Sequence, residues 1–117
     1  MLDFLSIAES IAVHGGVTVS VRGEELPTGG YFVSRYGFEE TVALDENLSS
    51  SVAAYAERYS DHLDRPGVYL GAWVEDGHVV LDVSDWWQSR TLARAAGWER
   101  GQGAIFDIAK QEVVPVR

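Results

Sequence analysis

Two apolar stretches joined by an Asp-Gly turn constrain the fold of this chain most strongly. Residues 68–74 and 78–83 are rich in β-branched and aromatic side chains, and Glu75-Asp76-Gly77 lies between them. An Asp-Gly pair between two such stretches is among the strongest short-range signals of a β-hairpin, because it tolerates the backbone angles of a tight turn. The sequence therefore predicts an antiparallel strand pair in the second half of the chain.

Hydrophobic periodicity assigns the other elements. Apolar residues three and four positions apart predict helices over residues 2–12, from Asn47 to Leu63, and from Ser84-Asp85 or Ser89 to Arg100. The first helix should end at Gly15-Gly16. The side chains expected to form the buried stripe of the last helix are Leu92, Ala95, Ala96 and Trp98. Further strands are predicted over residues 17–21, 31–35, 38–44, 104–108 and 113–116, the last kept at a sheet edge by Pro115.

These elements define the expected fold class. Their order is α-β-β-β-α-β-β-α-β-β, in which hairpins alternate with helices. That order is typical of an α+β fold, here a mainly antiparallel sheet of five to seven strands with two or three helices packed on one face. Because 117 residues match the usual size of one domain, residues 1–117 are expected to form a single domain.

The charge of the chain limits its partners. Eighteen acidic residues face nine basic ones, a net charge of −9, so the chain is not expected to bind nucleic acid through a basic face or an anionic membrane. Residues 1–47 hold eight acids and only two bases. This N-terminal segment could attract a basic partner, with Glu39 and Glu40 as the candidate contact residues. Its negative charge could equally serve only to keep the protein soluble.

The absence of cysteine and of sorting signals indicates where in the cell the protein is expected. With no cysteine there is no thiol nucleophile, thiolate metal site or disulfide, as is common in intracellular proteins. The N-terminal apolar stretch lacks the basic region of a signal peptide, and no apolar run approaches the roughly 18 residues of a membrane span. We therefore expect a cytoplasmic protein.

One internal echo suggests an enzyme. Residues 80–84 resemble residues 105–109, with Asp82 and Asp107 at matching positions. If these two strands are parallel neighbours joined by the last helix, the two carboxylates could share a proton or hold a magnesium ion, as in a small metal-dependent or acid/base hydrolase. The simpler interpretation places each aspartate on the polar side of an alternating strand. No other motif marks a catalytic residue, a cofactor or a metal ligand.

Aromatic residues favour a binding function. Trp86 and Trp87 adjoin each other at the predicted start of a helix, where successive side chains cannot both face one core. With Arg90 they have the composition of an interaction hot spot, although amphipathic rings can equally cover a core. We expect a non-enzymatic binding or accessory protein that engages another protein. The alternatives are the hydrolase with Asp82 and Asp107, and an assembly protein that forms a homodimer through an edge strand.

A resemblance points in the same direction. At Gly29–Ser34, Pro66–Trp73, Leu81–Ser84 and Ala104–Asp107 the chain resembles a group of small acidic proteins of actinobacteria and their phages that has no established activity. The resemblance implies a small accessory protein associated with a mobile element, such as an inhibitor or an anti-restriction factor. It implies no catalytic residue.

Overall fold

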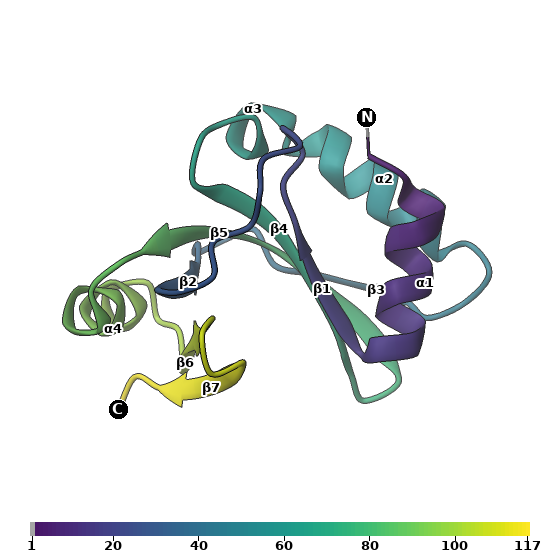
Figure 1. The fold of residues 1–117 in the computed structure, drawn as a ribbon. Helices are drawn as coiled ribbons and strands as arrows, with labels where there is room; N and C mark the ends of the chain where they lie inside the picture. Colours follow the sequence, from purple (N-terminus) through teal and green to yellow (C-terminus); the bar gives the residue numbers. More distant parts are fainter. Residues whose placement is uncertain (1) are drawn as a thin grey trace.

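The predicted hairpin forms the centre of the sheet in the computed structural model, which describes residues 2–117 (Figure 1). Strands β4 (Val68–Glu75) and β5 (His78–Trp87) pair antiparallel from one end to the other. Asp76 and Gly77 occupy the turn with φ angles of 51° and 75°. These are the positive angles that an Asp-Gly turn accommodates, so the hairpin prediction is confirmed.

In the described part of the chain, seven strands form one curled antiparallel sheet, a half-barrel, in the order β1-β4-β5-β2-β6-β7, with β3 also paired to β5. The five remaining strands are β1 (Gly16–Val19), β2 (Tyr31–Ser34), β3 (Glu40–Ala43), β6 (Ala104–Asp107) and β7 (Glu112–Pro115). Strand β7 pairs with β6 and ends at Pro115, as expected of an edge strand. The α+β prediction is confirmed.

The described residues, 2–117, also form four helices, namely α1 (Phe4–His14), α2 (Leu48–Arg58), α3 (Ser60–Leu63) and α4 (Arg90–Glu99). The single helix predicted from Asn47 to Leu63 is divided at Tyr59, whose φ and ψ of −108° and 23° leave the helical region. This break turns the chain so that Leu63 is fully buried in the main core. Within residues 2–117, no helix combines the length and the apolar character needed to cross a membrane.

Local hydrogen bonds explain where the helices begin and end. The Asp3 carboxylate accepts from the backbone N–H groups of Leu5 and Ser6, both at 3.1 Å, and caps α1. Gly15 ends α1 with a φ of 82°, as predicted. Ser89 caps α4, because Ser84 lies within β5. The predicted strand His78–Val83 thus continues to Trp87, where its last residues pair with β2.

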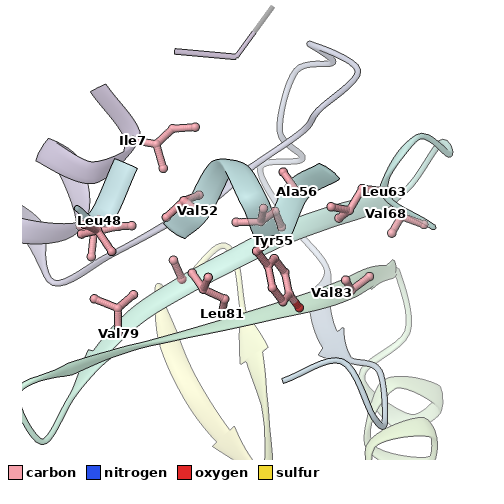
Figure 2. Packing of buried hydrophobic residues seen from close by; sticks show 13 residues of the cluster. Ile7, Leu48, Val52, Tyr55, Ala56, Leu63, Val68, Val79, Leu81 and Val83 are labelled. Atoms are coloured by element: carbon pink, nitrogen blue, oxygen red, sulfur yellow. The ribbon is translucent and has the colours of Figure 1, made fainter. Parts of the chain in front are cut away.

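All the helices pack on one face of the sheet. Alternate residues of β5, Val79, Leu81 and Val83, contact the helices α1 and α2 in the main core (Figure 2). Further along the same face, Val33 of β2 packs against α4. On the opposite face, a smaller apolar cluster holds Phe32, Tyr69 and Ile108. The curled sheet is therefore buried on both faces around β5.

The buried side of α4 differs from the prediction. Of Leu92, Ala95, Ala96 and Trp98, only Ala96 is buried, whereas Leu92 is 58% and Trp98 60% exposed. The helix instead turns Ala93, Ala96 and Gly97 toward the sheet. A Cβ atom at Gly97 would lie 2.9 Å from Val116 Cγ2, so only small residues fit between α4 and the sheet. Close packing, and not apolar periodicity, decides which side of α4 is buried.

We expect Gly97→Ala to destabilise the protein by about 1–3 kcal/mol, because the added methyl group overpacks this interface. Helix propensity alone would predict stabilisation by about 1 kcal/mol. Urea unfolding followed by tryptophan fluorescence measures the difference. In a Val116→Ala background the loss should shrink, since the nearest colliding group, Val116 Cγ2, is gone. Stabilisation by Gly97→Ala in the wild-type background would contradict the close packing.

Candidate functional site

The structure does not bring Asp82 and Asp107 together. Strand β2 lies between β5 and β6 and is antiparallel to both, so these strands are parallel but are not neighbours, contrary to the prediction. Tyr31 of β2 is paired with both Trp87 and Asp107, which places Asp107 level with a position five residues beyond Asp82. At about 3.3 Å per residue, the two aspartates are roughly 16 Å apart along the strands. They cannot share a proton or a metal ion at that separation.

Asp107 has a structural role in the turn between β6 and β7. Its carboxylate accepts a hydrogen bond from the backbone N–H of Lys110 at 3.1 Å. This bond satisfies the buried carboxylate and fixes the turn, in which Gln111 has a φ of 52°. Among residues 2–117, no three His, Asp or Glu side chains are grouped so that they could hold a metal ion.

Asp82 is a buried carboxyl group on the face of the sheet that carries no helix. It is 3% exposed and lies opposite Gly71 of β4, where any side chain would collide with its Oδ1 atom. The Ser34 hydroxyl donates a hydrogen bond to Oδ2. Strand β2 ends at Ser34, which pairs with Ser84 of β5. The earlier part of β5, from His78 to Leu81, pairs with β3 instead. Asp82 therefore lies where β5 changes partners.

Burial raises the pKa of Asp82 to about 6. The hydrogen bonds from Ser34 and from the Gly71 backbone favour the charged form and limit this rise, while the negative charge of Glu39 adds to it. A carboxyl group that titrates near neutral pH is suited to acid/base chemistry. At 3% exposure, however, the group is closed to a substrate in this structure. It is a titratable group of the core.

A second polar cluster surrounds Asp85 on the helix-bearing face. Its carboxylate accepts two hydrogen bonds from Arg100, at 2.9 and 3.1 Å, and one from Arg35 at 3.1 Å. The indole N–H of Trp87 donates to the same carboxylate at 2.6 Å. Burial acts to raise the pKa of Asp85, but the bonds from Arg100, Trp87 and Arg35 outweigh it and lower the pKa. Asp85 stays charged and holds both arginines in place.

This cluster determines the position of Trp87. Its ring lies half-buried beside α4, with the Arg100 guanidinium 5.7 Å from the ring centroid. Trp86, the next residue back on β5, points to the opposite face, is 38% exposed and donates its indole N–H to the carbonyl of Gly29. The two rings therefore lie on opposite faces of the sheet. The prediction that these residues start a helix is wrong, because both belong to β5. Sequence reasoning missed Asp85 and Arg100, because nothing in their local pattern indicates the pairing.

The other residues proposed for binding lie apart. Arg90 is exposed at the start of α4, and Glu39 is exposed just before β3. Glu40 forms an ion pair with Arg58 of α2, and this hydrogen bond lowers the pKa of Glu40. The acidic residues therefore lie on the side of the sheet nearer α2, and Arg90 lies at the other end with α4 (Figure 1).

The exposed side of α4 carries large apolar side chains. We call Leu92, Ala95 and Trp98 the α4 outer face; all three are exposed. The Arg117 guanidinium lies 4.9 Å from the centre of the Trp98 ring. Residues 86–106 hold three arginines and one acid, Glu99, in a chain whose net charge is −9. The α4 outer face is therefore an apolar surface in the one extended basic segment of an acidic protein.

Comparison with known families, curated proteins and solved structures finds no match to this chain. The resemblance to small acidic proteins of actinobacteria and their phages stays a prediction and names no functional residue.

We expect Asp82→Asn to stabilise the protein at neutral pH. The folded state holds the Asp82 proton more tightly than the unfolded chain does, with pKa values of about 6 and 3.8. Raising the pH from about 3.8 to about 6 therefore lowers the free energy of unfolding of the wild-type protein. Above about pH 6 this contribution of Asp82 no longer changes with pH. The substitution should add about 2–3 kcal/mol more stability at pH 7.5 than at pH 4. Urea unfolding at the two pH values measures this difference.

Ser34→Ala provides the control. It removes a hydrogen bond to the charged form of Asp82, so it should raise the pKa further and destabilise the protein more at pH 7.5 than at pH 4. An equal effect of Asp82→Asn at both pH values would show that the carboxyl group does not titrate in this range.

Proposed function

We propose that this chain is a non-enzymatic binding protein that engages another protein through the α4 outer face. One observation carries the proposal: α4 buries only small side chains and leaves Leu92 and Trp98 more than half exposed. Exposed large apolar groups in a cluster are typical of interaction surfaces. Tryptophan with nearby arginine is the combination most enriched among residues that dominate binding energy.

Charge supports a partner with an acidic surface. Arg90 and Arg117 are exposed near the two ends of the α4 outer face, and the guanidinium of Arg94 donates to the carbonyl of Val116. Arginines around an apolar centre favour a partner whose apolar patch is bordered by carboxylates. Trp86 and Trp87 each use their indole N–H within the chain, so the surface centres on Trp98 and keeps Arg90 at its border.

The expectations of a basic partner, a hydrolase and an accessory role bear on this proposal in different ways. A basic partner at the acidic side would meet Glu39, since Glu40 is paired with Arg58. The hydrolase alternative has no support, because Asp82 and Asp107 lie far apart in the register. An accessory role in the cytoplasm, as an inhibitor or anti-restriction factor of a mobile element, fits an acidic protein without cysteine.

A photo-crosslinking residue in place of Leu92 tests the proposed surface in the native host. We expect a discrete adduct with a protein, because a partner on the α4 outer face would contact this position. The adduct should disappear when Trp98→Ala or Arg90→Glu is added, since these changes remove the apolar centre or invert the bordering charge.

The same photo-crosslinking residue at Tyr36 is the matched control. Tyr36 is 79% exposed and lies in the connection between β2 and β3, so it is not part of the α4 outer face. An equal adduct from this position, or an adduct at Leu92 that survives both substitutions, would contradict the proposed surface.

A further inference from the structure

An open groove lies at the N-terminal end of α1, beside α2. Apolar groups of Leu2, Phe4 and Leu5 line one side, and α2 contributes Ala53 with two serine hydroxyls from Ser49 and Ser50. Asp3 also lines the groove. Leu5 is among the most exposed apolar side chains of the described chain. The groove thus presents apolar surface beside a carboxylate.

This groove has the opposite character to the α4 outer face. No lysine or arginine occurs before Arg22, and α1 adds the exposed acid Glu9. The α4 outer face instead presents the Trp98 ring with the Arg117 guanidinium against it. An apolar groove beside acids and an exposed indole beside a guanidinium complement each other in both hydrophobicity and charge.

We propose that the partner of the α4 outer face is a second copy of this chain, whose α1–α2 groove receives Trp98. In this contact Arg117 approaches Asp3 as the indole enters the groove. The inference rests on the proposed function, because it names the partner of the same surface. A second copy is favoured over an unrelated protein because the chain itself carries the complementary surface.

The arrangement of the fold makes this contact intermolecular. Helices α1 and α4 lie at opposite ends of the molecule, so Trp98 cannot reach the groove of its own chain (Figure 1). Each contact joins two different surfaces and leaves one groove and one Trp98 free. Repeated contacts of this kind generate a reciprocal two-fold dimer, a ring or an extending chain. The wild-type protein should therefore associate to an extent that increases with concentration.

Two exposed substitutions test the contact, each on one of the surfaces. Trp98→Glu removes the indole, and Ser50→Arg fills the groove and repels Arg117. Sedimentation velocity on the full chain should show wild-type oligomers that increase up to about 1 mM. Each variant alone should associate at least roughly tenfold more weakly, as expected when a central contact is lost. Thr41→Arg, an exposed position of β3 on the face of the sheet that carries no helix, makes the same change of charge and should leave association unchanged.

An equimolar mixture of the two variants gives the sharpest result. Trp98→Glu keeps an intact groove and Ser50→Arg keeps an intact Trp98, so the mixture should form a 1:1 heterodimer and nothing larger. Far-ultraviolet circular dichroism should match the wild type for both variants, because both substituted side chains are exposed.

Each other outcome overturns the inference. A wild-type protein that stays monomeric up to about 1 mM has no such contact. Normal association of Trp98→Glu would indicate pairing through another surface, such as an edge strand. Normal association of Ser50→Arg would show that Trp98 binds elsewhere. If the Leu92 adduct contains a different protein while the chain stays monomeric, the proposed binding function stands and the self-association fails; no adduct and no oligomer would refute both.

Discussion

The pairing of β5 with three partners is the constraint on which the rest of the structure depends. One edge of β5 pairs with β4 from His78 to Asp85, and the other edge is shared by β2 at Ser84–Trp87 and by β3 at His78–Leu81. The middle of the strand, Val79–Ser84, is buried on both faces. Helices α1 and α2 cover one face. On the other face, Asp82 is buried at the point where β5 changes its pairing from β3 to β2. A ten-residue central strand thus positions almost every other element.

The Asp85 cluster connects the two apolar clusters of the helix-bearing face. In the strand register Asp85 lies between Val68 of β4 and Val33 of β2. Val68 belongs to the main core, and Val33 belongs to the apolar cluster under α4. A charge at this point is stable because Arg100 and Arg35 neutralise it and a tryptophan N–H completes its hydrogen bonds. The cluster also draws the end of α4 toward the sheet, since Arg100 directly follows the helix.

Close packing of α4 determines which of its side chains are exposed. Because Gly97 and two alanines lie against the sheet, the large side chains Leu92 and Trp98 have to point outward. The surface proposed for binding therefore results from the way the interior is packed. The same sheet places the acidic, apolar groove of α1 and α2 at the far end (Figure 1). The self-association proposed above would join these two surfaces in neighbouring copies.

The sequence by itself determined the features that depend on local backbone chemistry. Asp76-Gly77 specifies the central hairpin, Gly15 the end of α1 and Pro115 an edge strand, because each requires particular φ angles or a missing N–H. Only the tertiary structure decided that β2 separates Asp82 from Asp107, that Asp85 binds Arg100, and that Trp98 faces outward. Those outcomes depend on pairing between distant segments and on the space between α4 and the sheet, and hydrophobic periodicity carries information on neither.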